Sequence, residues 1–132
     1  MKMSTYQKNL FFCAVLLLLT GCAGGGSGSG AAAAVERYFQ MLVTGDENQL
    51  VDASCAAWEE SARLEMESFT AVSVELVDMT CQEAGQEDDI TLVTCRGTIV
   101  ANYGNEVLEI DLSERTYEVI TEAGELRLCG YR

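Results

Sequence analysis

The hydrophobic period of the chain changes once, and this change constrains the fold more than any other feature. Between residues 31 and 70, apolar side chains recur every three or four positions, which is the period of an amphipathic helix. From Ala71 onward, apolar and polar side chains alternate, as is typical of half-buried strands. Helices followed by a run of strands predict an α+β domain.

Two N-terminal helices are expected. The first carries Val35, Tyr38, Phe39 and Leu42 on one face and ends at Gly45. The second begins after Asp46, an N-cap residue followed three positions later by Gln49. Its apolar stripe consists of Val51, Cys55, Trp58, Ala62, Met66 and Phe69. Its acidic residues are interpreted as solvated flanks: Glu59, Glu60, Glu65 and Glu67.

Turn residues divide the rest of the chain into a curved four-stranded antiparallel sheet. The expected strands cover residues 72–81, 90–103, 106–121 with a bend at 113–115, and 125–132. Residues 82–89 form a polar turn region, and Gly104-Asn105 is a hairpin turn.

Folding about Gly104-Asn105 places Ile99 opposite Ile110 and Ala101 opposite Leu108. Because side chains alternate along a strand, Cys95 then shares the inward face with these residues.

The N-terminal segment has the features of an export signal. Lys2 and Lys8 precede a ten-residue apolar run, Leu10 to Leu19, which is too short to span a bilayer. The sequence Leu19-Thr20-Gly21-Cys22 resembles the lipobox of bacterial lipoproteins. This resemblance implies cleavage before Cys22 and a lipid on its thiol, whereas the alternative is an ordinary secreted signal that is cleaved nearer Ala23.

We therefore expect three parts. Residues 1–21 are a lipoprotein signal peptide, residues 22–30 are the lipidated Cys22 with a Gly/Ser tether, and residues 31–132 are a single domain. The expected location is the outside of the cytoplasm, on the cell membrane or, in a cell with two membranes, on the outer one.

Charge and composition exclude several kinds of partner. Removal of Lys2 and Lys8 with the signal leaves six arginines against 21 acidic residues, a net charge of −15. Such a domain repels nucleic acid, and the absence of histidine removes the commonest general base and metal ligand. We expect no cofactor and no metal site. A calcium-responsive cluster at Glu83, Glu87, Asp88 and Asp89 is a weaker alternative to a solvated hairpin tip.

Four cysteines remain beyond Cys22: Cys55, Cys81, Cys95 and Cys129. An exported domain normally pairs such residues in disulfides, and their spacing lacks the short Cys-x-x-Cys of a zinc site. Pairing Cys81 with Cys95 would staple the first hairpin, and Cys55 with Cys129 would tie the second helix to the last strand. All three ways of pairing these cysteines remain open. Side chains alternate along a strand, so Cys129 would point to the opposite face from Leu126 and Leu128, and this disfavours the arrangement.

The order of the elements resembles the nuclear transport factor two-like (cystatin-like) superfamily. The resemblance rests on Thr44-Gly45-Asp46 between two helices and on a meander that closes on Glu122 to Cys129. It implies a curved sheet around a long helix with a cone-shaped cavity, for which Tyr38, Trp58 and Tyr103 are candidate lining residues. The alternative for these aromatic residues is a place in the core.

Enzymes of that superfamily use an aspartate, or an aspartate with a histidine, and a tyrosine in the cone. This chain has no histidine, and Asp111 alternates away from the apolar face, so no catalytic residue is assigned. We expect a non-catalytic, lipid-anchored module that binds an envelope protein or a small apolar ligand. The alternative is an isomerase or cyclase that uses a buried carboxylate and a tyrosine.

Overall fold

The computed structural model describes residues 30–132, which form three α-helices and five β-strands. The helices are α1 (Ala31–Thr44), α2 (Glu47–Asp52) and α3 (Glu59–Glu67). The strands are β1 (Ser73–Glu87), β2 (Ile90–Asn102), β3 (Val107–Asp111), β4 (Thr116–Glu122) and β5 (Glu125–Tyr131), with a 3₁₀ turn, η1 (Leu112–Glu114), between β3 and β4. The α+β class is confirmed, whereas the expected counts of two helices and four strands are wrong.

The predicted signal peptide, the lipidation site at Cys22 and the tether up to residue 29 lie outside the described residues. Within residues 30–132, no helix combines the length and the apolar character that crossing a membrane requires.

Helix α1 has the predicted buried face and the predicted end. The side chains of Val35, Tyr38, Phe39 and Leu42 are all buried against the sheet. Gly45 adopts a left-handed conformation with φ of 75°, and its N–H donates to the carbonyl of Met41. A residue without a Cβ takes this conformation at little cost, so the glycine ends the helix.

The expected second helix is interrupted by a pairing with the last strand. It starts as predicted, because the Asp46 carboxylate accepts a hydrogen bond from the N–H of Gln49 at 3.1 Å. However, the N–H of Leu128 donates to the carbonyl of Ala53 at 2.9 Å, and the N–H of Cys55 donates to the carbonyl of Leu128 at 2.8 Å. These hydrogen bonds form a parallel bridge between Ser54 and Leu128, so α2 ends at Asp52 and α3 begins only at Glu59.

Strand β2 is the centre of the sheet, and its two halves have different neighbours. The order is β1-β2-β4-β5, and β3 also pairs with β2. Residues 91–94 of β2 pair with β4, while residues 98–102 pair with β3. The predicted third strand is therefore two strands, separated by η1, where Leu112 is buried and Asp111 accepts a hydrogen bond from the N–H of Ser113 at 2.8 Å.

The registers of the hairpins agree with the sequence except at the first turn. Ile99 pairs with Ile110, and Ala101 pairs with Leu108, as predicted. Strand β1 continues to Glu87, which pairs with Ile90, so the turn is shorter than the predicted region 82–89.

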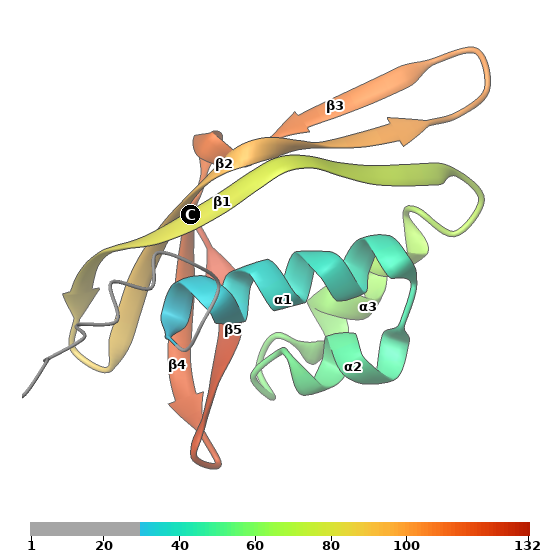
Figure 1. The fold of residues 1–132 in the computed structure, drawn as a ribbon. Coiled ribbons are helices and arrows are strands. Elements are labelled where there is room, and N and C mark those ends of the chain that lie inside the picture. The colour runs from blue at the N-terminus through green and yellow to red at the C-terminus, as the bar shows by residue number, and fades with distance from the viewer. Residues whose placement is uncertain (1–29) are drawn as a thin grey trace, which may run out of the picture.

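The sheet curves around the helices, as Figure 1 shows. The β1–β2 hairpin lies along α1, while β4 and β5 run at an angle to this hairpin and lie beside the helices. Two carboxylates fix α1 to β1: Glu83 accepts a hydrogen bond from the N–H of Ala31 at 3.1 Å, and Glu36 accepts one from the N–H of Cys81 at 3.0 Å. The core lies between α1 and the concave face of the sheet.

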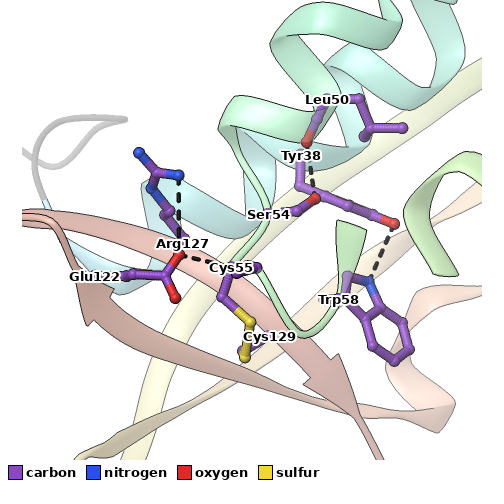
Figure 2. The surroundings of a disulfide bond; sticks show 9 residues. Tyr38, Leu50, Ser54, Cys55, Trp58, Glu122, Arg127 and Cys129 are labelled. Atoms are coloured by element: carbon purple, nitrogen blue, oxygen red, sulfur yellow. Dashed lines mark hydrogen bonds and ion pairs between the residues drawn. A yellow bond between two sulfur atoms is a disulfide. The ribbon is translucent and has the colours of Figure 1, made fainter. Parts of the chain in front are cut away.

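Two disulfides close the domain, and they join the two pairs named in the sequence analysis, despite the parity of Cys129. Cys81 and Cys95 face one another across β1 and β2. Cys55 and Cys129 join the segment between α2 and α3 to β5 (Figure 2). Cys129 directly follows Leu128, which forms the pairing described above. The second bond closes a separation of 74 residues, so it holds the helices on the end of the sheet.

Candidate functional site

Two adjoining hollows lie between the helices and the concave face of the sheet. The first, which we call the chamber, has a volume of about 170 Å³, and its wall includes Phe39, Ile99, Ile110, Glu65, Arg115 and Tyr131. The second, which we call the groove, has a volume of about 580 Å³. It lies at the C-terminal end of α1, and its wall includes Val43, Arg63, Met66, Val72 and Val74. The side chains of Leu42 and Phe69 belong to both walls, so the two hollows are neighbours.

The carboxylate of Glu65 lies at the chamber and accepts hydrogen bonds from two tyrosines. Tyr38 of α1 donates its hydroxyl hydrogen to Oε2 of Glu65 at 2.6 Å, and Tyr131 of β5 donates to Oε1 at 2.7 Å. Trp58 donates its Nε1–H to the hydroxyl oxygen of Tyr38 at 3.3 Å (Figure 2). These four residues, the Glu65 cluster, connect α1, α3 and β5.

Both tyrosines of the cluster remain protonated at neutral pH. Burial raises the pKa of Tyr38, and the negative charge and hydrogen bond of Glu65 raise it further. Burial also raises the pKa of Tyr131, with a further contribution from its hydrogen bond to Glu65. The hydroxyl groups therefore act as hydrogen-bond donors to the carboxylate.

Tyr117 lies behind the cluster in the core. Its ring meets the rings of Phe39 and Tyr131 edge to face, at centroid distances of 5.3 and 6.1 Å. Its hydroxyl donates to the carbonyl of Leu112 at 3.0 Å, and burial raises its pKa to about 12. This tyrosine supports η1, which in turn positions Arg115.

The structure brings together two of the three aromatic residues that the sequence proposed for the cavity. Tyr38 is fully buried and touches Trp58 through the hydrogen bond described above. Tyr103 lies in the turn between β2 and β3, is 47% exposed, and takes no part in the cluster. The wall of the chamber includes Tyr131 in place of Tyr38 and Trp58.

Glu65 was interpreted from the sequence as a solvated residue, and this interpretation is wrong. Its side chain is half-buried and faces the chamber. The spacing of Glu65 indicates that it lies on the apolar face of the helix. Glu65 and Met66 follow Ala62 by three and four positions, and Phe69 follows by seven. An acid on the apolar face of a helix needs a partner, and both partners are tyrosines distant in sequence.

Arg115 is the other charged residue at the chamber. Its guanidinium carbon lies 4.2 Å from the centroid of the Tyr131 ring, a cation–π arrangement. Among residues 30–132, ion pairs are formed by Arg63, Arg127 and Arg132, and Arg115 takes part in none of them.

Within the described residues, the hydroxyl groups of the Glu65 cluster and the cysteine sulfurs are already engaged. The hydroxyl hydrogens of Tyr38 and Tyr131 are directed at Glu65, and Cys55, Cys81, Cys95 and Cys129 are all oxidised to disulfides. What the chamber offers a ligand is an apolar wall and the guanidinium of Arg115.

No protein-family model and no curated protein matches this sequence. Several solved structures are similar in fold at low identity. Pgp2, the helical cell shape determining protein of Campylobacter jejuni, is 11% identical with a TM-score of 0.50, over 76% of this chain and 38% of that one. The likeness is one of fold alone.

Two further structures have slightly lower scores. An NTF2-like protein of unknown function from Pseudomonas putida is 14% identical with a TM-score of 0.47, over 79% of this chain and 87% of that one. Aln2 from a Streptomyces species is 15% identical with a TM-score of 0.48, over 75% of this chain and 82% of that one.

Proposed function

We propose that this protein is a non-catalytic binding module, built on the nuclear transport factor two-like fold and tethered to the outer side of a membrane by a lipid on Cys22. Its ligand is a small, largely apolar molecule that occupies the chamber and the groove. The Gly and Ser-rich residues 23–30 would connect the lipid to the domain and so keep the domain close to the bilayer.

The adjoining chamber and groove carry the proposal. Small-molecule sites are concave, mostly apolar, and typically about 300–1,000 Å³ in volume. The groove, at about 580 Å³, falls within this volume range, and the chamber extends it toward the core. The wall of the groove combines apolar side chains with the Arg63–Glu47 ion pair and Glu67. Phe69 and Leu42 stand between the two hollows, so their rotamers set how far a ligand can enter.

The alternative of an isomerase or cyclase requires a tyrosine that donates to the substrate and a carboxylate that accepts a proton from it. Glu65 and Tyr131 are a carboxylate and a tyrosine at the chamber. However, each oxygen of Glu65 accepts a hydroxyl hydrogen, and Tyr131 donates its own to Glu65. A substrate would have to break these bonds, and this cost favours the binding role.

Fluorescence of N-phenyl-1-naphthylamine, an uncharged apolar probe that brightens away from water, tests the proposal on the mature chain. We expect saturable binding by the wild type and about tenfold weaker binding by Ile110→Trp, because Ile110 lines the chamber and a larger side chain would fill it. Val107→Trp is the matched control, since Val107 lies on the same strand and is 59% exposed. Equal binding by both variants, or no binding by the wild type, would contradict the proposal.

A further inference from the structure

We propose that the chamber selects ligands that carry a carboxylate, which Arg115 binds while the apolar part of the ligand fills the chamber. This inference rests on the proposed binding function and adds the chemical class of the ligand. A short-chain carboxylic acid fits, because about 170 Å³ corresponds to roughly five or six water volumes of about 30 Å³ each.

The first argument is the state of the Arg115 guanidinium. The mature chain has 21 acidic residues and six arginines. Arg63, Arg127 and Arg132 are ion-paired, Arg37 donates to the carbonyl of Leu126, and Arg96 is exposed to solvent on β2. In so acidic a domain, Arg115 lies half-buried at an apolar hollow and, within the described residues, against a tyrosine ring with no carboxylate partner. A guanidinium in this setting keeps its planar set of N–H donors for a carboxylate.

The second argument is that Glu65 is already satisfied. A carboxylate in the same hollow could otherwise pair with Arg115 and occupy its N–H donors. Instead, the hydroxyls of Tyr38 and Tyr131 donate to its two oxygens at 2.6 and 2.7 Å. These two charge-assisted hydrogen bonds stabilise the carboxylate without Arg115.

The third argument is rigidity. Arg115 follows η1, which is held by the buried side chain of Leu112 and by the hydrogen bond from Tyr117 to its carbonyl. The ring of Tyr131 supports the guanidinium from one side. A donor fixed in this way loses little conformational entropy when it binds a ligand.

Thermal unfolding of the mature chain with two ligands of the same shape tests the inference. Sodium pentanoate carries the carboxylate, and pentanamide is its uncharged counterpart. A ligand that binds only the native state stabilises it by RT ln(1 + L/Kd), where L is the free ligand concentration, so at equal concentration the ligand that binds more tightly raises the melting temperature more. We expect a larger rise with pentanoate than with pentanamide, corresponding to about ten- to hundredfold tighter binding, which is the range for a hydrogen bond to a charged group.

Arg115→Gln should remove the preference for pentanoate, so that pentanoate and pentanamide raise the melting temperature by the same amount. Arg115→Lys keeps the charge and should keep part of the preference, which guards against a general loss of folding in the glutamine variant. Arg96→Gln is the matched control, because Arg96 is an exposed arginine on β2.

Equal responses of the wild type to the two ligands would overturn the inference, as would a preference for pentanoate that persists in Arg115→Gln. If the naphthylamine still binds in that case, the proposed binding function stands and the carboxylate preference alone fails. If the wild type binds neither the naphthylamine nor pentanoate, both proposals fail together.

Discussion

Gly97 of β2 lies directly against Met79 of β1, so that a Cβ at position 97 would come within 2.7 Å of the Cα of Met79. The backbone of Gly97 has φ of 111°, a conformation that residues with side chains rarely adopt. A bulge in β1 between Val77 and Thr80 lies opposite Gly97. At the same position along β2, the strand that pairs with it changes from β4 to β3. The curvature that creates the chamber thus depends on this glycine.

Gly97→Ala should therefore lower the free energy of unfolding by about 2–4 kcal/mol, from backbone strain together with overpacking against β1. Urea unfolding, followed by the emission of Trp58, the single tryptophan, measures the change. Gly104→Ala is the control: its φ is 88°, but nothing lies within 4 Å of the added Cβ, so the loss should be about 1 kcal/mol. Similar losses for the two variants would refute the close contact.

Glu65→Ala should lower the free energy of unfolding by about 2–4 kcal/mol. The change removes the acceptor of two tyrosine hydroxyls, and each hydrogen bond to a charged group contributes about 1.5–3 kcal/mol, less where solvent reaches it. Glu67→Ala, an exposed residue on the same helix, should stay within about 0.5 kcal/mol of the wild type. If urea unfolding finds the two variants alike, the Glu65 cluster contributes no stability.

Stability should fall as the pH rises above about 10. Burial raises the pKa of Tyr117 to about 12 in the folded protein, whereas its unfolded value is about 10. The unfolded chain loses this proton first, so unfolding becomes easier by up to about 1.4 kcal/mol per pH unit until the folded pKa is passed. Tyr38 and Tyr131 are shifted in the same direction.

Urea midpoints between pH 8 and pH 12 give the measurement. Tyr117→Phe should flatten the decline, while Tyr103→Phe, a change at the exposed turn, should leave its slope unchanged. A wild-type stability that is constant up to pH 12 would contradict the assignment of buried, protonated tyrosines.

Cys22→Ser should release the protein from the membrane fraction. Lipid chains contribute about 0.8 kcal/mol per buried CH₂, so a protein with two or more chains stays bound, and a protein without them does not. Mass spectrometry of the wild type should find a polypeptide that begins at residue 22 with a lipid mass on that residue. A free thiol at Cys22 in the mature wild type would remove the anchor from the proposal.

The sequence predicts local geometry well where one short-range rule decides it. Gly45 ends α1, Asp46 caps α2, and the turn at Gly104-Asn105 sets the pairing of Ile99 with Ile110. Each of these follows from the conformational preference or the hydrogen bonding of residues within a few positions.

The sequence fails where distant segments compete with local preference. Residues 53–55 have helical spacing, but Ser54 forms a parallel bridge with Leu128 that interrupts the helix. The local sequence pattern places Glu65 on the surface, because it does not contain the hydrogen-bond partners of Glu65. These partners, Tyr38 and Tyr131, are 27 and 66 residues away. No local sequence pattern indicates a carboxylate whose hydrogen-bond donors come from two other elements of the fold.

The hydrogen bond from the N–H of Ala31 to Glu83 gives the domain a definite mechanical attachment point. Tension that arrives along the chain at Gly30 reaches α1 and β1 together, and β1 is covalently joined to β2 by Cys81–Cys95. A pull from the N-terminal side is thus expected to act on a helix and a cross-linked hairpin together. The chamber lies beyond this junction, on the far part of α1.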